Sequence, residues 1–114
     1  MRYAAALAAL LVAATACGGD GPPSALPNVV GAVEQLDGAA VLVDDDNPEV
    51  CGAWFTPAPD VRVLRKAGGG RYERDTWSAL TVGRPVEVWI APGTLTQTSC
   101  PARSVAGTVV LTAE

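Results

Sequence analysis

The sequence predicts an all-β protein, a small closed barrel of five to six strands in Greek-key order, joined by one disulfide bond. Three observations support this prediction. Apolar and polar residues alternate with a period of two in several short runs, and no long run with the helical period of 3.6 appears after residue 27. Residues that favour turns separate these runs. Two cysteines, at positions 51 and 100, lie within the region that contains these runs.

The first two strands are predicted as a hairpin. Residues 28–36, NVVGAVEQL, alternate so that Val29, Gly31 and Val33 share one face. The dipeptide Asp37-Gly38 is a strong two-residue turn signal, and residues 39–44, AAVLVD, pair back as the second strand.

The middle of the chain is predicted as short extended pieces. Residues 51–57 and 60–66 count as two segments because Pro57 and Pro59 lack the N–H donors that a strand ladder needs. Residues 67–75 are predicted as a turn and then a polar stretch. Residues 76–83 are predicted as irregular or as a single helical turn.

Two further strands follow. Residues 84–92 place Val86, Val88 and Ile90 on one face, with Glu87 and Trp89 on the other. The last strand, residues 104–113, is expected to place Val105, Val109 and Leu111 on one face. The intervening residues 93–103 are expected to form a loop with a possible short strand.

Closure into a barrel follows from this number of strands, because an open sheet of this size would leave unpaired edges. A small Greek-key barrel of the oligonucleotide/oligosaccharide-binding type, the OB-fold, fits the strand count. Gly31 and Gly107 lie inside strands, where barrels use glycine to bend sharply. In such a barrel the third and fifth strands are parallel neighbours, which places Cys51 and Cys100 near the same end.

The N-terminus predicts export. Residues 3–16 form an apolar run that follows Arg2, too short to span a membrane and suited to a signal peptide at residues 1–16. The ATAC that ends this run resembles a bacterial lipobox, in which Cys17 receives a diacylglyceryl group and becomes the first residue. The alternative is ordinary secretion with an incidental cysteine. Residues 17–27, rich in Gly and Pro, are expected to act as a flexible tether for a domain at 28–114.

Charge excludes some partners. Residues 17–114 carry seven Lys and Arg against twelve Asp and Glu, a net charge of −5. This charge argues against binding to nucleic acid, which needs a basic face, and against electrostatic adhesion to anionic lipid. The expected partners are the bacterial cell membrane, through the lipid anchor, and cell-wall glycan or another envelope protein on the extracytoplasmic side.

The cysteines favour a structural role. With Cys17 lipidated, Cys51 and Cys100 form an even pair on an exported chain, and a disulfide is the expected state. A redox or metal role is the alternative, but the sequence contains no C-x-x-C motif and no histidine. No metal site and no cofactor are predicted.

Two polar segments resemble ligand loops only superficially. The acidic residues of 44–49 could supply oxygens to Ca²⁺, but Pro48 and Glu49 occupy positions that an EF-hand loop cannot accept, and a solvated loop is favoured. The segment AGGGR, residues 67–71, lacks the Gly-Lys-Ser/Thr ending of a phosphate loop and is predicted as a hairpin tip.

The aromatic residues are the main candidates for ligand binding. Trp54 and Phe55 are adjacent, so a strand sends one into the core and the other outward. Trp77 is expected to plug one barrel end. Trp89 is expected on the outer face, where it could form a platform for sugars or peptides with Tyr72 or with the outward member of the Trp54–Phe55 pair. The alternative is that the 93–103 loop or the tether covers Trp89.

Catalysis is not indicated. Histidine, the commonest acid–base residue, is absent, and no Ser or Thr has an obvious activating base. The leading hypothesis is therefore a lipid-anchored extracytoplasmic binding module. A glycan binder is the alternative, and a hydrolase or redox enzyme is a third hypothesis.

Four segments resemble a family of small bacterial lipoproteins with an OB-like domain, most of them of unassigned function. They are VVGAVEQL, AAVLVD, LTVGRPVEVWI (80–90) and TSCPARSVAGTVVL (98–111). The resemblance covers most of residues 28–112 and implies an OB-like barrel behind a lipid anchor. Cys100 stands where the family has tyrosine, consistent with an added disulfide. The family has no agreed catalytic residues, so no such role carries over.

Overall fold

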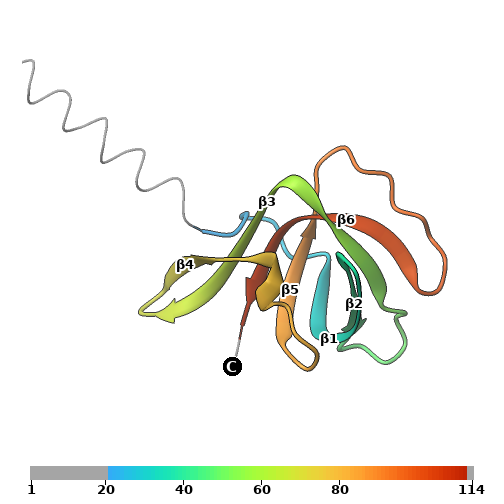
Figure 1. The fold of residues 1–114 in the computed structure, drawn as a ribbon, viewed down its shortest axis with the longest axis horizontal. Coiled ribbons are helices and arrows are strands. Elements are labelled where there is room, and N and C mark those ends of the chain that lie inside the picture. The colour runs from blue at the N-terminus through green and yellow to red at the C-terminus, as the bar shows by residue number, and fades with distance from the viewer. Residues whose placement is uncertain (1–20, 113–114) are drawn as a thin grey trace, which may run out of the picture.

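Six strands and one short 3-10 helix make up residues 21–112, the part of the chain that the computed structural model describes (Figure 1). The predicted signal peptide and Cys17 lie outside the described residues. Within them, no helix is long and apolar enough to cross a membrane. The elements in chain order are β1 (Val29–Asp37), β2 (Ala40–Asp45), β3 (Ala53–Gly68), β4 (Arg71–Asp75), η1 (Trp77–Ala79), β5 (Pro85–Ile90) and β6 (Ala102–Leu111).

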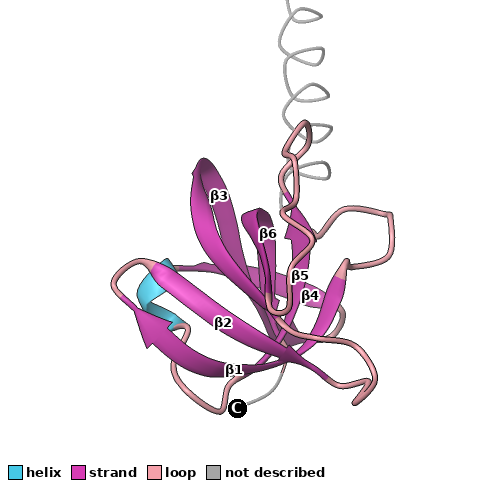
Figure 2. Ribbon diagram, turned by 90° about the vertical axis from the view of Figure 1, so that its right-hand side faces the viewer, coloured by secondary structure: helices cyan, strands magenta, loops and turns pink. Residues whose placement is uncertain are grey.

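The sheet closes on itself. Its strand order is β2-β1-β5-β6-β3-β4, and a further pairing between β2 and β3 completes a five-stranded barrel. The pairing of β3 with β6 is parallel, whereas all the other pairings are antiparallel. β4 is an extra strand that pairs only with β3. This arrangement confirms the predicted all-β, OB-fold-like Greek-key barrel, and Figure 2 shows the strands curling around its interior.

The interior is filled by the inward side chains of the five barrel strands, as the alternation predicts. Phe55 on β3 is the largest fully buried side chain, only 1% exposed. Val33 on β1 and the pair Val86 and Val88 on β5 join it in one apolar cluster. The predicted inward faces of β1 and β5 are therefore confirmed, and Phe55 is the inward member of the Trp54–Phe55 pair.

The β1–β2 turn lies one residue later than predicted. Asp37 is the last residue of β1 and pairs with Ala40, so Gly38 and Ala39 form the turn. Gly38 has φ of +61°, a left-handed conformation that costs glycine little. The turn is therefore centred on the glycine rather than on Asp37.

The prediction of two short pieces around the prolines is wrong, because β3 runs unbroken for 16 residues. Its pairing with β6 shifts register between Pro57 and Arg62, and Pro59 lies in that unpaired interval. A proline at such an irregularity removes no ladder bond, so the strand continues. The sequence does not predict β4 as a strand, because an edge strand that carries mostly charged side chains shows no apolar alternation.

A bulge at Gly107 changes which residues of β6 face inward. Ala106 and Val109 both belong to the core, whereas Val105 is half-buried and outside that cluster, contrary to the prediction that it shares a face with Val109. The β5–β6 register shifts at this point. A Cβ on Gly107 would come within 2.9 Å of the Ala91 Cα, so only glycine fits here.

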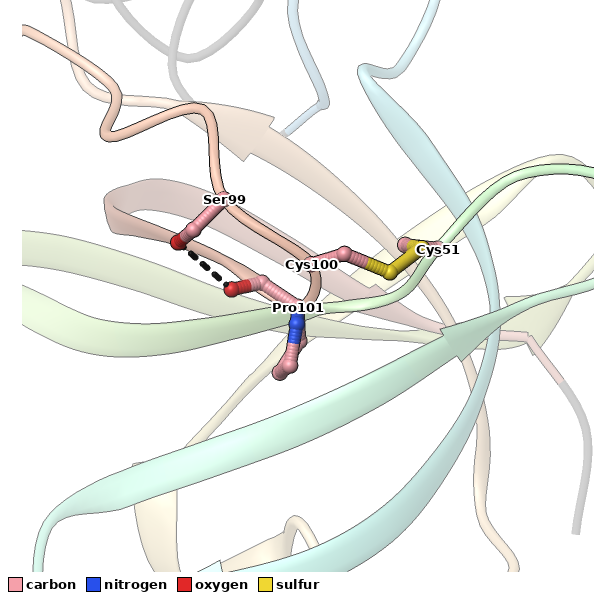
Figure 3. Close-up of a disulfide and its surroundings, with 4 residues drawn as sticks. All are labelled: Cys51, Ser99, Cys100 and Pro101. Carbon is pink, nitrogen blue, oxygen red and sulfur yellow. Dashed lines mark hydrogen bonds between the residues drawn. A yellow bond between two sulfur atoms is a disulfide. The ribbon is translucent and has the colours of Figure 1, made fainter.

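The predicted disulfide is confirmed. Cys51 and Cys100 are joined, with their Cα atoms 5.6 Å apart, immediately before the parallel β3–β6 pairing begins (Figure 3). The Ser99 Oγ donates to the Pro101 carbonyl oxygen at 2.9 Å on the same loop. The bond therefore fastens the 91–101 loop to the start of β3.

Trp77, which is expected to plug one end of the barrel, lies next to the apolar core. It packs against the main apolar cluster, and Leu80 just after η1 is buried in that cluster. The indole Nε1 of Trp77 donates to the Ala39 carbonyl oxygen at 2.8 Å, which ties η1 to the β1–β2 turn.

Candidate binding groove

A second, smaller apolar cluster lies on the outer face of the barrel. Leu64 on β3, Trp89 on β5 and Val110 on β6 form it, and Tyr72 on β4 packs against it. Each of the first three residues alternates with an inward neighbour, so their side chains point away from the interior. Residues on an outer barrel face stay dry only if something covers them.

Tyr72 packs on this cluster, and the N-terminal segment of residues 21–28, which we call the strap, is bonded to Trp89. It has no regular secondary structure but is hydrogen-bonded to the barrel at several points. The Arg62 Nη2 donates to the Gly21 carbonyl oxygen at 2.7 Å, and the Trp89 Nε1 donates to the Ala25 carbonyl oxygen at 2.9 Å. At the C-terminal end of the strap, the Asn28 Oδ1 accepts from the Ile90 backbone N–H at 2.8 Å.

Part of the segment that is expected to act as a flexible tether contacts the barrel. Composition alone predicts a flexible segment at residues 17–27, yet residues 21–27 lie along β5 and β3 with specific contacts. Backbone carbonyl oxygens of the strap accept hydrogen bonds from two long side chains of the barrel, Arg62 and Trp89. No local sequence pattern indicates this arrangement. The sequence signal that could have suggested it is Trp89 itself, because a large outward aromatic needs either a ligand or a cover.

A groove of about 450 Å³ lies between the strap and the barrel. Its polar groups come from Asn28 on the strap, Asp60 and Arg62 on β3, and Thr108 on β6, and apolar residues supply the rest of the wall. A mostly apolar wall with a few directed polar groups is typical of small-molecule sites, and this volume falls within their usual range. The lining residues are Pro23, Ala25, Leu26, Asn28, Asp60, Arg62, Trp89, Ile90, Ala91, Pro92, Gly107 and Thr108.

Trp89 contributes to this groove without offering an open ring face. Its side chain lies on the outer face as predicted, but it is only 7% exposed and its N–H is bonded to the strap. Of the two covers considered for Trp89, the N-terminal segment is the one that bonds to it. A ligand in the groove therefore meets part of the indole and cannot stack on it while the strap is in place.

The other two aromatic candidates are placed differently. Tyr72 is half-buried and packs against the Trp89 cluster, so these two aromatics are brought together as predicted. Trp54 is half-buried on the first half of β3, in register with Leu42 on β2 and Arg103 on β6. It is the outward member of its pair, but it does not line the groove.

The acidic loop is organised by its own backbone. The Asp45 Oδ1 accepts from the Asn47 N–H at 2.9 Å, and the Asn47 Oδ1 accepts from the Glu49 N–H at 3.0 Å. These contacts shape a solvent-exposed turn. Among residues 21–112, no group of three or more acidic, Cys or His side chains is arranged to hold a metal ion.

The strap contact predicts a defined effect for Trp89→Phe. This substitution keeps a ring over Leu64 but removes the N–H donor to Ala25 and some buried area. We expect it to lower the free energy of unfolding by about 1–3 kcal/mol in urea denaturation, because a polar group loses its partner and packing is reduced. Tyr72→Phe keeps its packing and is the control, with an expected change below about 0.5 kcal/mol. Equal losses for the two variants would contradict the role assigned to the indole N–H.

In comparisons with known proteins, no family model, no curated protein and no solved structure matches the chain.

Proposed function

We propose that this protein is a lipid-anchored, extracytoplasmic binding module, related to the small OB-like lipoproteins that its motifs resemble, and that the groove under the strap is its ligand site. The groove is the observation that carries the proposal. The ATAC segment before residue 17 supports the anchor. We propose a binder rather than an enzyme because the chain contains no histidine, the commonest acid–base residue.

The groove lining favours a hydroxyl-rich ligand such as a cell-wall glycan fragment. A carboxylate (Asp60), a guanidinium (Arg62), a carboxamide (Asn28) and a hydroxyl (Thr108) lie among apolar residues. Such a mixture of donors and acceptors with no excess of either charge suits neutral hydroxyl groups. The apolar wall suits the C–H faces of a sugar ring. Glycan binding would therefore rest on directed hydrogen bonds rather than on stacking against Trp89.

Amide chemical shifts in an NMR titration with muramidase-solubilised cell-wall fragments test this proposal. We expect shifts confined to residues 25–28, 60–62, 89–92 and 107–108, which line the groove. Asp60→Asn is expected to weaken binding at least about tenfold, because a hydrogen bond to a charged group contributes about 1.5–3 kcal/mol. Asp37→Asn, next to the β1–β2 turn, removes the same charge and is expected to leave the affinity unchanged.

Two outcomes would contradict the assignment. An absence of shifts at saturating fragment concentration would reject glycan as the ligand. Shifts centred on Trp54 and Arg103 would move the site to the second outward aromatic, where an indole and a guanidinium lie in register on neighbouring strands.

The anchor has a separate test. Mass spectrometry of the protein extracted from membranes is expected to show a mature chain that begins at a diacylated Cys17. Cys17→Ser is expected to release the protein into the soluble fraction. A mature N-terminus at any other residue would reject the anchor and leave the groove assignment untouched.

A further inference from the structure

We infer that one face of the β3–β4 hairpin, the face that carries Lys66, Tyr72 and Arg74, rests on the anionic headgroup surface of the membrane and orients the barrel there. The inference rests on the lipid anchor proposed above and goes beyond it, because an anchor alone fixes no orientation. Three observations support it: the distribution of charge along the chain, the segregation of charge between the two hairpin faces, and the position of the strap.

Charge is unevenly distributed in spite of the net value of −5. Five of the seven Lys and Arg residues after residue 16 lie between residues 62 and 74, on β3 and β4. Six of the twelve acids lie between residues 34 and 49, on the β1–β2 hairpin and the loop that follows it. A negatively charged protein can still carry a local excess of cations, and the five in this segment are Arg62, Arg65, Lys66, Arg71 and Arg74.

The two faces of the hairpin differ in charge. Lys66 is in register with Tyr72, and Arg74 is in register with Leu64. Because cross-strand partners share a face, Lys66 and Arg74 lie on the strap side with the outer apolar cluster. Both side chains are exposed.

The two acids of β4, Glu73 and Asp75, lie on the other face of the hairpin. There, Arg65 forms ion pairs with Glu73 at 2.7 Å and with Asp75 at 3.5 Å. Where β3 pairs with β4, the strap-side face therefore presents cations and a tyrosine without an acid. Asp60, the acid of β3 that lines the groove, is six residues from Lys66, roughly 20 Å along an extended strand. Glu87 on β5 shares the sheet face, but Val110 and Leu64 separate it from Arg74, at a distance of roughly 14 Å for three strand spacings.

The strap brings this face close to the anchor. The carbonyl of Gly21 accepts a hydrogen bond from Arg62 on β3, so the described chain begins beside the basic hairpin. Figure 1 shows the strap, in blue, passing close to β3 before it reaches β1. Only four residue steps separate Cys17 from Gly21, which allow at most about 14 Å at 3.6 Å per residue. A lipid on Cys17 would therefore hold the basic face within reach of the headgroups.

The chemistry of the face suits an anionic bilayer surface. Lys and Arg near such a surface each contribute a factor of about five in affinity, equivalent to about 1 kcal/mol. A half-buried tyrosine between them has the amphipathic character that is favoured at membrane interfaces. The acids at the β1–β2 end would be repelled, so both charge groups favour the same orientation.

The test uses the only lysine of the chain. A chain from residue 17 contains all of 21–112 and both cysteines of the disulfide, so Cys17 is its single free thiol. Coupling Cys17 to a maleimide lipid builds a thioether anchor on vesicles of phosphatidylcholine, with or without phosphatidylglycerol. The rate at which a water-soluble N-hydroxysuccinimide ester acylates the Lys66 amine is then followed by mass spectrometry. Arg103 on β6 pairs with Trp54, near the opposite end of β3 from Lys66. The substitution Arg103→Lys therefore adds a reference lysine there without changing the net charge.

We expect the Lys66 amine to react about fivefold more slowly on the phosphatidylglycerol vesicles, relative to Lys at position 103. Salt of about 1 M, where the Debye length falls to about 3 Å, is expected to remove the difference. Arg74→Gln is expected to reduce the protection severalfold. Arg103→Gln, measured without the reference lysine, removes the same charge elsewhere and is expected to preserve it.

Equal protection of both lysines, or protection of Lys66 that does not depend on anionic lipid, would overturn the inference. Because the thioether is made chemically, this result would leave the proposed anchor intact. Conversely, finding no acyl group on Cys17 in cells would reject the anchor without changing the outcome on vesicles.

Discussion

Replacing both disulfide cysteines, Cys51→Ser with Cys100→Ser, is expected to lower the free energy of unfolding by about 4 kcal/mol. The bond joins residues 49 apart, and a crosslink of that span restricts the unfolded chain far more than the folded one. For a domain of this size such a loss is a large part of the total stability, and it lowers the melting temperature by roughly 15 °C or more. Thermal and urea unfolding followed by far-UV circular dichroism measure both quantities.

The structure also predicts which segment opens first when the disulfide is removed. Without the bond, the 91–101 loop retains the backbone bridge between Gln97 and Arg103 and the hydroxyl contact between Thr96 and Ser104 at 2.9 Å. Hydrogen exchange is expected to rise in this loop before it rises in the barrel. Ser99→Ala removes one local hydrogen bond and is the control, expected to cost less than about 1 kcal/mol. A double variant as stable as its parent would show that the bond is dispensable for the fold.

Alternation was enough to predict most of the barrel. Val29, Gly31 and Val33 on β1 and Val86, Val88 and Ile90 on β5 face inward because a period of two leaves no other way to bury them. The pairing of Cys51 with Cys100 followed from their number and from the parallel neighbours of the predicted barrel. These features depend on local pattern and on closure, both of which a sequence carries directly.

Features that depend on long-range pairing could not be predicted in the same way. β4 is a strand because β3 extends beyond the barrel and offers it an edge, not because Arg71–Asp75 favour a strand. The inward and outward sides of β6 exchange at Gly107, where the backbone of Ala91 approaches. A single bulge reverses the inward or outward direction of every residue on one side of it, so a strict period of two places Val105 on the wrong face.

The sequence predicts only part of the candidate site. The outward direction of Trp89 followed from the inward direction of its neighbours, but its cover and the groove depend on where residues 21–28 fold back. The net charge of the chain does not reveal the basic face, because a sum over all charged residues says nothing about where those residues lie. Only the register of β3 with β4 separates Lys66 and Arg74 from Glu73 and Asp75.

Gly31→Ala is expected to destabilise the barrel by about 3 kcal/mol, at the upper end of the usual range for overpacking. A Cβ at position 31 would overlap the backbone carbonyl oxygen of Asp44 on β2. That atom belongs to the β1–β2 ladder and cannot move as a side chain can, so the two strands would have to separate. The neighbouring bond from the Asp46 N–H to the Val30 carbonyl oxygen, 2.9 Å long, would be strained as well.

Two other glycines separate this crowding from backbone conformation. Gly38→Ala meets no atom within 4 Å but keeps φ of +61°, so it is expected to cost only about 1 kcal/mol. Gly21→Ala has open space and no left-handed φ, and is expected to change stability by less than about 0.5 kcal/mol. The urea concentration at the midpoint of unfolding should therefore be highest for Gly21→Ala, lower for Gly38→Ala and lowest for Gly31→Ala. If Gly31→Ala were no worse than Gly38→Ala, the close approach of β1 and β2, on which the tight bend of the barrel depends, would be ruled out.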